Sequence, residues 1–566
     1  MFKDNRFTGL TVSDLRRDLI AGITVGVVAI PLGMAFAIAS GVKPEYGLYT
    51  TVIAGLIVAL MGGSRFQIAG PTGAFIPILL AIVLQYGYED LLIAGFLAGI
   101  MLVIMGFFKI GNLIKFIPRS VTIGFTSGIA VIIFSGQIEG FLGLQNMEKK
   151  EYFHENMLQI IQNIGTFNFY SVLLAIIGIL LIIFVPKFFP RIPILLVALI
   201  IPTFISILLF PDKVATIGTE FGGISQKIPS LTLPDLSWEK ILYLWQPAFV
   251  IAMLGGIESL LSAVVADGMT GKQHNSNREL VGQGVANMVT PLFGGIPATG
   301  AIARTATNIR AGAVSPISGV VQALFVLLTV LLFAPYAAHI PLASMAPILM
   351  IVAFNMSERK AFWHILKLRT ADSLVLLATF LLTVFVNLTI AVPVGLVLAM
   401  ILFIKQMSGV LAVENIKAEN HNVIKTPEKV CPQIASFTVH GPLFFGASDR
   451  FETLITRSLN KRPAVLILKM RHVSTIDVTG EANLATLVRD FQKTNGVVLI
   501  AELKEHPLKM LEKSGLYDII GPEHFFKTTT EAINYALGKI QVNECIYCAQ
   551  NGHKTCQTYV EMEPRS

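Results

Sequence analysis

The chain has 566 residues, of which 54% are hydrophobic and 14% are charged, and it carries a formal net charge of +7. Soluble domains usually contain about 25% charged residues, so this composition excludes an ordinary soluble enzyme. The positive excess is dispersed and forms no basic patch with interleaved aromatic residues, which argues against nucleic acid as a partner.

Long stretches without a charged side chain fill the first 404 residues. About 20 apolar residues cross a bilayer core as a helix, and a helix satisfies its own backbone polar groups there. The pattern predicts fourteen membrane segments, some of them short, with starts near residues 19, 46, 71, 90, 118, 168, 191, 241, 280, 303, 315, 341, 371 and 389. Lys3, Arg6, Arg16 and Arg17 precede the first segment and place the N-terminus in the cytoplasm. The even count returns the C-terminus to the same side.

The shifts in composition predict seven regions. They are an N-terminal cytoplasmic segment (1–18), a first membrane repeat (19–211), a connector (212–240), a second repeat (241–410), a linker (411–433), a small α/β domain (434–540) and a Cys/His tail (541–566). The fold class is therefore mainly α, with seven segments in each repeat and a small cytoplasmic α/β domain. An odd number of segments per repeat makes the second repeat inverted relative to the first.

The third segment of each repeat is interrupted by Gly and Pro and contains Thr-Gly-Ala, at 72–74 and at 299–301. Such paired interruptions point to the binding site of a transporter. Each break predicts a short extended piece followed by a half-helix, whose N-terminus carries about half a positive charge and free N–H groups for an anion. Arg304 adds a full positive charge. The alternative is that Arg304 and Arg310 are loop residues at a membrane edge.

Glu258 lies in the eighth segment, with seventeen uncharged residues before it and eight after it. Carboxylates inside a membrane are costly and usually mark an ion or proton pathway. Glu258 is therefore a candidate for proton coupling, with a static ion pair or a helix-end position as the alternative. The nearby Ser259 and Ser262 are candidates to supply hydroxyls on neighbouring faces, but serines in membrane helices more often bond back to carbonyl groups of their own helix, and back-bonding is the favoured expectation.

After the membrane part, short apolar runs at 465–468 and 496–500 predict buried strands, and patterns at 481–493 and 506–515 predict helices. The last stretch contains Cys545, Cys548, His553 and Cys556 within twelve residues, a set able to close around zinc. The alternative is a disordered tail with incidental cysteines. Nothing in the chain resembles a nucleophile–base triad, a Walker loop or a dinucleotide fingerprint, so no enzymatic activity is expected and no cofactor is required.

These motifs resemble the sulfate permease (SulP) family of anion transporters from end to end. The similar stretches are 30–37 in the first segment, 69–72 at the first break, 258–261 around Glu258, 293–297 and, most specifically, 304–312. The resemblance implies a core domain that moves against a gate domain, dimers, and an anion held between the N-termini of segments three and ten. Carried over by position, it implicates Phe36, Thr72, Gly73, Ala303 and Arg304 in anion binding.

Two departures refine the expected activity. Some relatives have Gln where this chain has Leu32, so a polar contact is missing here. Sodium-coupled bicarbonate members have Asp and Thr where this chain has Glu258 and Ile302, which argues against a sodium site because hard cations need several oxygen ligands. The expectation is proton-coupled symport of a sulfate-, bicarbonate- or dicarboxylate-class anion across a bacterial cytoplasmic membrane. An anion exchanger without proton coupling and a membrane-anchored sensor remain alternatives.

The α/β domain resembles the STAS domain that ends many of these transporters. Its marker is the stretch 476–480 before a helix. In related bacterial regulators the residue at the position of Thr479 is phosphorylated, and a sensor would give its output there. Capping of the following helix by Asp477 or Thr479 is the favoured explanation of the motif.

Overall fold

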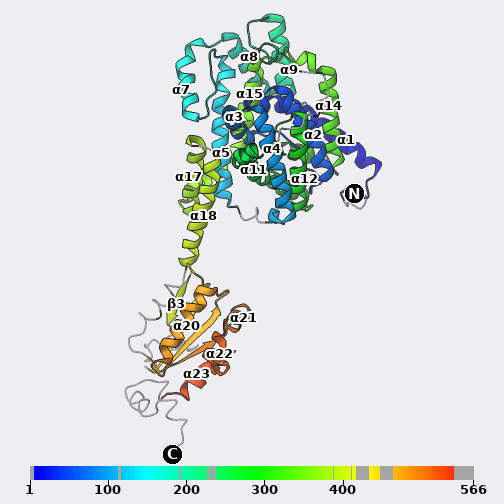
Figure 1. Ribbon diagram of the computed structural model, residues 1–566. Coiled ribbons are helices and arrows are strands. Elements are labelled where there is room, and N and C mark those ends of the chain that lie inside the picture. Colours follow the sequence, from blue (N-terminus) through cyan, green and yellow to red (C-terminus); the bar gives the residue numbers. More distant parts are fainter. Residues whose placement is uncertain are drawn as a thin grey trace, which may run out of the picture. The chain divides into compact units, whose positions relative to one another are not determined.

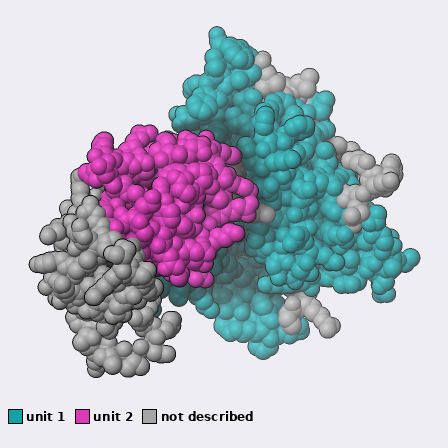
Figure 2. Space-filling model, turned by 90° about the horizontal axis from the view of Figure 1, so that it is seen from below, with its two compact units in different colours: residues 1–399 teal, residues 400–566 magenta. Residues whose placement is uncertain are grey.

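The computed structural model describes residues 6–112, 117–189, 193–224, 226, 231, 237–386, 388–409, 411–415, 433–446, 451, 455 and 463–540. The chain divides into two compact units, residues 1–399 and 400–566, which Figure 2 shows in different colours. The first unit is built almost wholly of helices, and the second contains a five-stranded sheet with its own helices.

Fourteen helices of the described residues correspond to the predicted membrane segments (Figure 1). They are α1 (Val12–Ala39), α2 (Pro44–Met61), α3 (Ile76–Tyr86), α4 (Tyr88–Phe107), α5 (Arg119–Gly136), α8 (Phe169–Phe188) and α9 (Ile194–Leu209), then α11 (Trp238–Thr270), α12 (Ser276–Val289), α13 (Ile302–Arg310), α14 (Ile317–Ala337), α15 (Leu342–Met356), α17 (Ala371–Phe385) and α18 (Leu388–Gly409). Only α1 starts more than five residues from its predicted position, because a capping box of Thr11 and Asp14 begins it before the apolar run.

Shorter helices connect these segments. They are α6 (Ile138–Leu142), α7 (Phe153–Asn163), α10 (Ile217–Phe221) and α16 (Arg359–Leu368), with 3-10 turns at Gly73–Phe75, Ile110–Asn112, Ile164–Thr166 and Thr290–Phe293. In the described part of the chain, eight helices are long and apolar enough to cross a membrane. Two helices that fall outside this group, α12 and α13, are short and carry polar side chains, among them Glu279, Gln283 and Arg304, which are buried between neighbouring helices.

Helix packing follows a seven-plus-seven symmetry, in which each helix corresponds to the one seven segments later. The pair α1 and α14 is matched by α11 and α4, the pair α2 and α14 by α12 and α4, and the pair α5 and α17 by α15 and α8. The first two pairs and their matches form a core group of helices, and the third belongs to a gate group. Figure 1 shows α1, α2, α12 and α14 gathered on one side of this unit and α5 and α17 on the other.

Glycines allow the closest approach inside the core group. A Cβ atom at Gly99 of α4 would lie 2.6 Å from the Gly284 carbonyl oxygen of α12, and a Cβ atom at Gly284 would lie 2.6 Å from the Gly99 carbonyl oxygen. Small residues at such crossings let two backbones pack directly in a membrane. A substitution at either glycine would therefore push α4 and α12 apart.

The second unit is a small α/β domain. Its strands β3 (Ala412–Asn415), β4 (Ile434–His440), β5 (Val465–His472), β6 (Val497–Ala501) and β7 (Phe525–Phe526) are ordered β3-β4-β5-β6-β7, with β3 antiparallel to β4 and the others parallel. Its helices are α20 (Val478–Gln492), α21 (Glu505–Ser514), α22 (Leu516–Ile520) and α23 (Thr529–Leu537). The predicted strands and helices of this domain are confirmed. Apolar clusters pack on both faces of β5, which explains its unbroken apolar run.

Candidate anion site

The two interrupted segments meet in the middle of the core group. Strands β1 (Ala69–Gly70) and β2 (Thr299–Gly300) pair antiparallel, with Ala69 opposite Gly300 and Gly70 opposite Thr299. The first strand leads through the 3-10 turn Gly73–Phe75 into α3, and the second leads into α13. Each break is thus an extended piece followed by a helix, and the pairing brings the starts of both helices together.

Close packing explains why glycine occupies both breaks. A Cβ atom at Gly70 would lie 2.6 Å from Nη1 of Arg304, and a Cβ atom at Gly300 would lie 1.7 Å from Nε2 of Gln67. Real Cβ atoms do not approach heavy atoms so closely. The missing side chains therefore leave room for the guanidinium group of Arg304 and for the amide of Gln67.

Arg304 lies in the first turn of α13 and is 2% exposed. Its Nη2 donates to the carbonyl oxygen of Pro71, in the first break. Its Nη1 is buried and has no hydrogen-bond partner among the described residues. Arg304 is therefore a buried residue beside the first break and not a loop residue at the membrane edge.

Glu258 lies in α11 and reaches the same break. The hydroxyl of Thr72 donates to its Oε2 at 2.9 Å, and within the described residues no ion pair joins Glu258 to Arg304. Pro71 and Thr72 are consecutive, so the cation and the carboxylate contact neighbouring residues of one short segment. A change of charge on Glu258 consequently changes the electrostatic potential at the place where Arg304 and the starts of α3 and α13 lie close together.

Ser259 ties α11 to the second break. The Gly300 amide donates to the Ser259 hydroxyl at 3.0 Å, and the hydroxyls of Ser259 and Thr299 are 2.8 Å apart. Because the Thr299 hydroxyl donates to the Gly255 carbonyl, the Ser259 hydroxyl donates to Thr299. The expectation that Ser259 bonds to its own helix is therefore wrong, since buried groups of the break compete for its hydroxyl.

Ser262 and Gln67 extend this network. Ser262 donates to the Thr305 hydroxyl at 3.2 Å, so the expectation of back-bonding is wrong for this residue too. Gln67 donates to the Ser259 carbonyl oxygen at 3.0 Å. The network holds both breaks against α11. Thr299 belongs to the predicted second break, whereas Gln67 was not predicted, because it precedes the interrupted stretch and is uncharged.

The other residues that the resemblance implicates lie around Gly73 and Arg304. Phe36 of α1 is buried, and its Cε1 would be 3.7 Å from a Cβ atom at Gly73. Ile133 of the gate group and Met356 also face Gly73, at 3.3 Å and 3.4 Å from the same position. Ala303 is exposed in the first turn of α13, beside Arg304.

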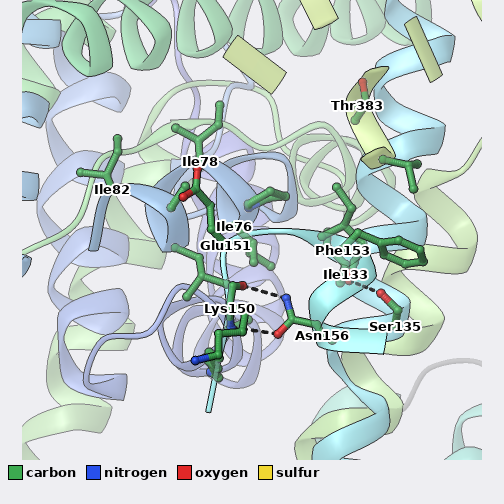
Figure 3. Close-up of a pocket in the computed structure, with 18 of the residues that line it drawn as sticks. Ile76, Ile78, Ile82, Ile133, Ser135, Lys150, Glu151, Phe153, Asn156 and Thr383 are labelled. Atoms are coloured by element: carbon green, nitrogen blue, oxygen red, sulfur yellow. Dashed lines mark hydrogen bonds between the residues drawn. The ribbon is translucent and has the colours of Figure 1, made fainter. Parts of the chain in front are cut away.

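A cavity of about 330 Å³ adjoins the site from the side of α3 and α5 (Figure 3). Ile76, at the start of α3, and Ile133 line one part of it, and Lys150 and Glu151 line another. Lys150 and Glu151 belong to a loop that two hydrogen bonds hold in place. The Asn156 side chain accepts from the Lys150 amide at 3.0 Å and donates to the Lys150 carbonyl at 2.7 Å. The cavity joins an apolar wall beside the site to a polar, ordered loop.

Two further carboxylates are buried, and both accept hydrogen bonds from backbone amides. Glu279 of α12 accepts from the amides of Gly63 and Ser64, at 2.7 Å and 3.1 Å. Asp18 of α1 accepts from the amides of Val314 and Ser315, at 2.7 Å and 3.1 Å. Both acids stand at the edge of an uncharged run, where the sequence does not distinguish them from ordinary flanking charges.

In the α/β domain, Asp477 caps α20. Its Oδ1 accepts from the Gly480 amide at 2.8 Å and its Oδ2 accepts from the Phe445 amide at 2.9 Å, whereas Thr479 is exposed. Capping by Asp477 therefore explains the motif. The predicted zinc ligands Cys545, Cys548, His553 and Cys556 lie outside the described residues, and the described residues contain no cluster of three or more metal-ligating side chains.

Comparisons with known proteins identify the family of this chain. The sulfate permease family matches residues 15–379, and the STAS domain matches residues 427–532. The chain is 54% identical over 521 residues to the "Putative sulfate transporter YvdB" of Bacillus subtilis, covering 92% of this chain and 98% of that protein. It is 31% identical over 552 residues to the bicarbonate transporter BicA of Picosynechococcus sp., covering 93% of this chain and 95% of BicA.

The fold is also that of a solved structure with low sequence identity. The murine Solute Carrier 26 family member A9 anion transporter, in its inward-facing state, matches with a TM-score of 0.83 at 19% identity, over 94% of this chain and 92% of that one. The family match covers more than half of the chain, and both bacterial relatives are covered almost completely. The chain belongs to the sulfate permease family of anion transporters and carries a C-terminal STAS domain.

Proposed function

We propose that this protein is a secondary active transporter that moves a small anion together with a proton. The observation that carries the proposal is the contact of Arg304 with Pro71 and of Glu258 with Thr72, two consecutive residues of the first break. The anion would lie between the starts of α3 and α13, beside Phe36, Thr72, Gly73, Ala303 and Arg304.

Charge supports an anion at this place. The N-terminus of a helix offers free N–H groups and about half a positive charge, and two such ends converge here. Arg304 adds a buried cation whose Nη1 has no partner among the described residues. An anion bound there would supply that partner and reduce the cost of burying the guanidinium group.

The proton would be carried by Glu258. An ionised Glu258 places a negative charge on the neighbour of the anion site, and protonation removes it. Protonation should therefore strengthen anion binding, and by thermodynamic reciprocity a bound anion should favour protonation. Symport requires that the core group moves only when the anion and the proton are both bound or when neither is bound.

The substrate class follows from the charge of the site and from the relatives. One of them is named as a sulfate transporter and the other as a bicarbonate transporter. We propose a sulfate-, bicarbonate- or dicarboxylate-class anion, carried by a homodimer in the bacterial cytoplasmic membrane with both termini in the cytoplasm. Membrane lipid is then the medium around the helices.

Uptake into proteoliposomes tests the proposal. Labelled sulfate, bicarbonate, fumarate and chloride would be offered with and without an inward proton gradient. Accumulation of one anion that depends on the gradient supports symport. Flux that ignores the gradient and requires a counter-anion inside would instead establish an exchanger. If none of the anions moved while Thr479 became phosphorylated in cells, the chain would be a sensor.

A further inference from the structure

An apolar groove of about 640 Å³ lies between α1, α9 and α14, away from the anion site. We propose that it holds an acyl chain of a membrane phospholipid. This inference stands apart from the proposed transport mechanism, because it concerns a binding site on the outer surface of the helices.

The groove has a buried floor and an open rim. Met34 of α1, Leu199 of α9 and Val330 of α14 form part of the floor and are at most 6% exposed. At the rim, Phe204 of α9 and Phe333 of α14 are 61% and 56% exposed. The opening is thus framed by large apolar side chains that have little contact with the protein.

The groove offers almost nothing to water. Its two threonines bond to their own helices, since Thr203 donates to the Leu199 carbonyl at 2.6 Å and Thr329 donates to the Phe325 carbonyl at 2.8 Å. A buried water molecule needs two to four polar partners, and cavities without them stay dry or take apolar ligands. The occupant must therefore be apolar.

The surroundings identify the source of that occupant. In a chain of this family, the exposed apolar faces of α9 and α14 contact lipid. These faces include residues outside the groove such as Leu208 and Leu332, and the rim of the groove belongs to the same faces. Tyr336 and His339 line the same groove at the end of α14 and are exposed. They supply polar groups for the glycerol or headgroup region, which favours a phospholipid over a hydrocarbon without a polar end.

The position of the groove suggests a purpose. Helices α1 and α14 belong to the core group, whereas α9 packs against α8 and α15 of the gate group, and α1 contacts both α9 and α14. A lipid chain between them is fluid and fills the space at any relative position of the two groups. A protein side chain in the same place would pack in one position and oppose movement.

Trp substitutions that fill the groove from opposite walls test the proposal. Thr203→Trp and Thr329→Trp remove no bond between helices, because both hydroxyls serve their own helix. Leu328→Trp is the matched control, since Leu328 is next to Thr329 on α14 but is 55% exposed and does not line the groove. Each full-length protein would be purified, washed with detergent and measured by native mass spectrometry for retained phospholipid.

We expect the wild type and Leu328→Trp to retain phospholipid, and both filling variants to retain about 10-fold less, the loss that two fewer buried CH₂ groups would cause. Equal retention in all four proteins would overturn the proposal. Thermal melting checks folding, and if one filling variant melts early the other decides. A disulfide-linked dimer formed through Thr203→Cys, in a chain whose four native cysteines are all changed to Ser, would assign the groove to a second copy and would also overturn it.

Discussion

Replacement of Arg304 by Gln should separate anion affinity from stability. The variant loses the hydrogen bond from Nη2 to the Pro71 carbonyl, which is worth about 1 kcal/mol. It also removes a buried cation whose Nη1 has no partner among the described residues. Removing the cost of burying that charge offsets part of the free energy lost with the hydrogen bond. We therefore expect a melting temperature close to that of the wild type.

Anion binding should respond far more strongly. Truncating one member of a buried, hydrogen-bonded charge pair costs about 2–5 kcal/mol, which corresponds to a loss of affinity of about 30-fold to several thousand-fold. The assay is thermal melting in increasing concentrations of sulfate or bicarbonate, because a ligand that binds the folded state stabilises it by an amount that grows with the logarithm of the ratio of ligand concentration to dissociation constant. The wild type should be stabilised by its anion and Arg304→Gln should not.

Two matched variants sharpen this test. Arg310→Gln removes the same charge from the same helix at an exposed position and should leave the anion response unchanged. Gly70→Ala keeps Arg304 but places a Cβ atom 2.6 Å from the present position of Nη1, so it should weaken the response by displacing the guanidinium group. If Arg304→Gln kept the wild-type anion response, the placement of the anion beside Arg304 would be refuted.

Three other outcomes are expected. Glu258→Gln keeps an acceptor for Thr72 but loses the titratable charge, so anion binding should persist while uptake stops responding to an inward proton gradient; acid-stimulated uptake like that of the wild type would contradict the coupling role. Glu279→Leu leaves the amides of Gly63 and Ser64 unpaired and should destabilise the protein by about 2–5 kcal/mol, seen as a lower melting temperature, whereas Glu279→Gln should lose less. In the STAS domain, burial raises the pKa of Glu502, but the hydrogen bonds from Thr529 and the nearby Lys469 outweigh it and hold the pKa below the ordinary value of 4.5. The stabilisation is therefore complete above pH 4.5 and is lost as the pH falls through the lowered pKa. The protection of the Thr529 amide against hydrogen exchange, taken relative to the intrinsic exchange rate at each pH, should therefore fall in acid in the wild type but depend less on pH in Glu502→Gln.

The course of the helices could be predicted because it depends on local properties. Apolar runs and their interruptions set the segment starts, and Gly-Pro at 70–71 and Pro297 interrupt regular helix at the two breaks. The same reasoning worked for the buried strands of the STAS domain, whose apolar runs need no knowledge of their neighbours.

Residue roles were harder where a partner decides them. Back-bonding to their own helix was the favoured expectation for Ser259 and Ser262, yet Ser259 bonds to the second break and Ser262 bonds to Thr305 of α13. Asp18 and Glu279 look like flanking charges in the sequence, and each proves to be buried against backbone amides of a distant segment. A hydrogen bond depends on which donor the fold brings within about 3 Å, and a single sequence does not contain that distance.

The sequence by itself determined the membrane character of this protein, the repeat of its interrupted segments and the charged residues close to them, because hydropathy, helix breaking and charge are properties of the residues. Only the tertiary structure decided that β1 pairs with β2, that Arg304 turns toward Pro71 while Glu258 accepts from Thr72, and that an apolar groove opens between α9 and α14. These features join residues far apart in the chain, and their geometry is set by how helices pack against one another.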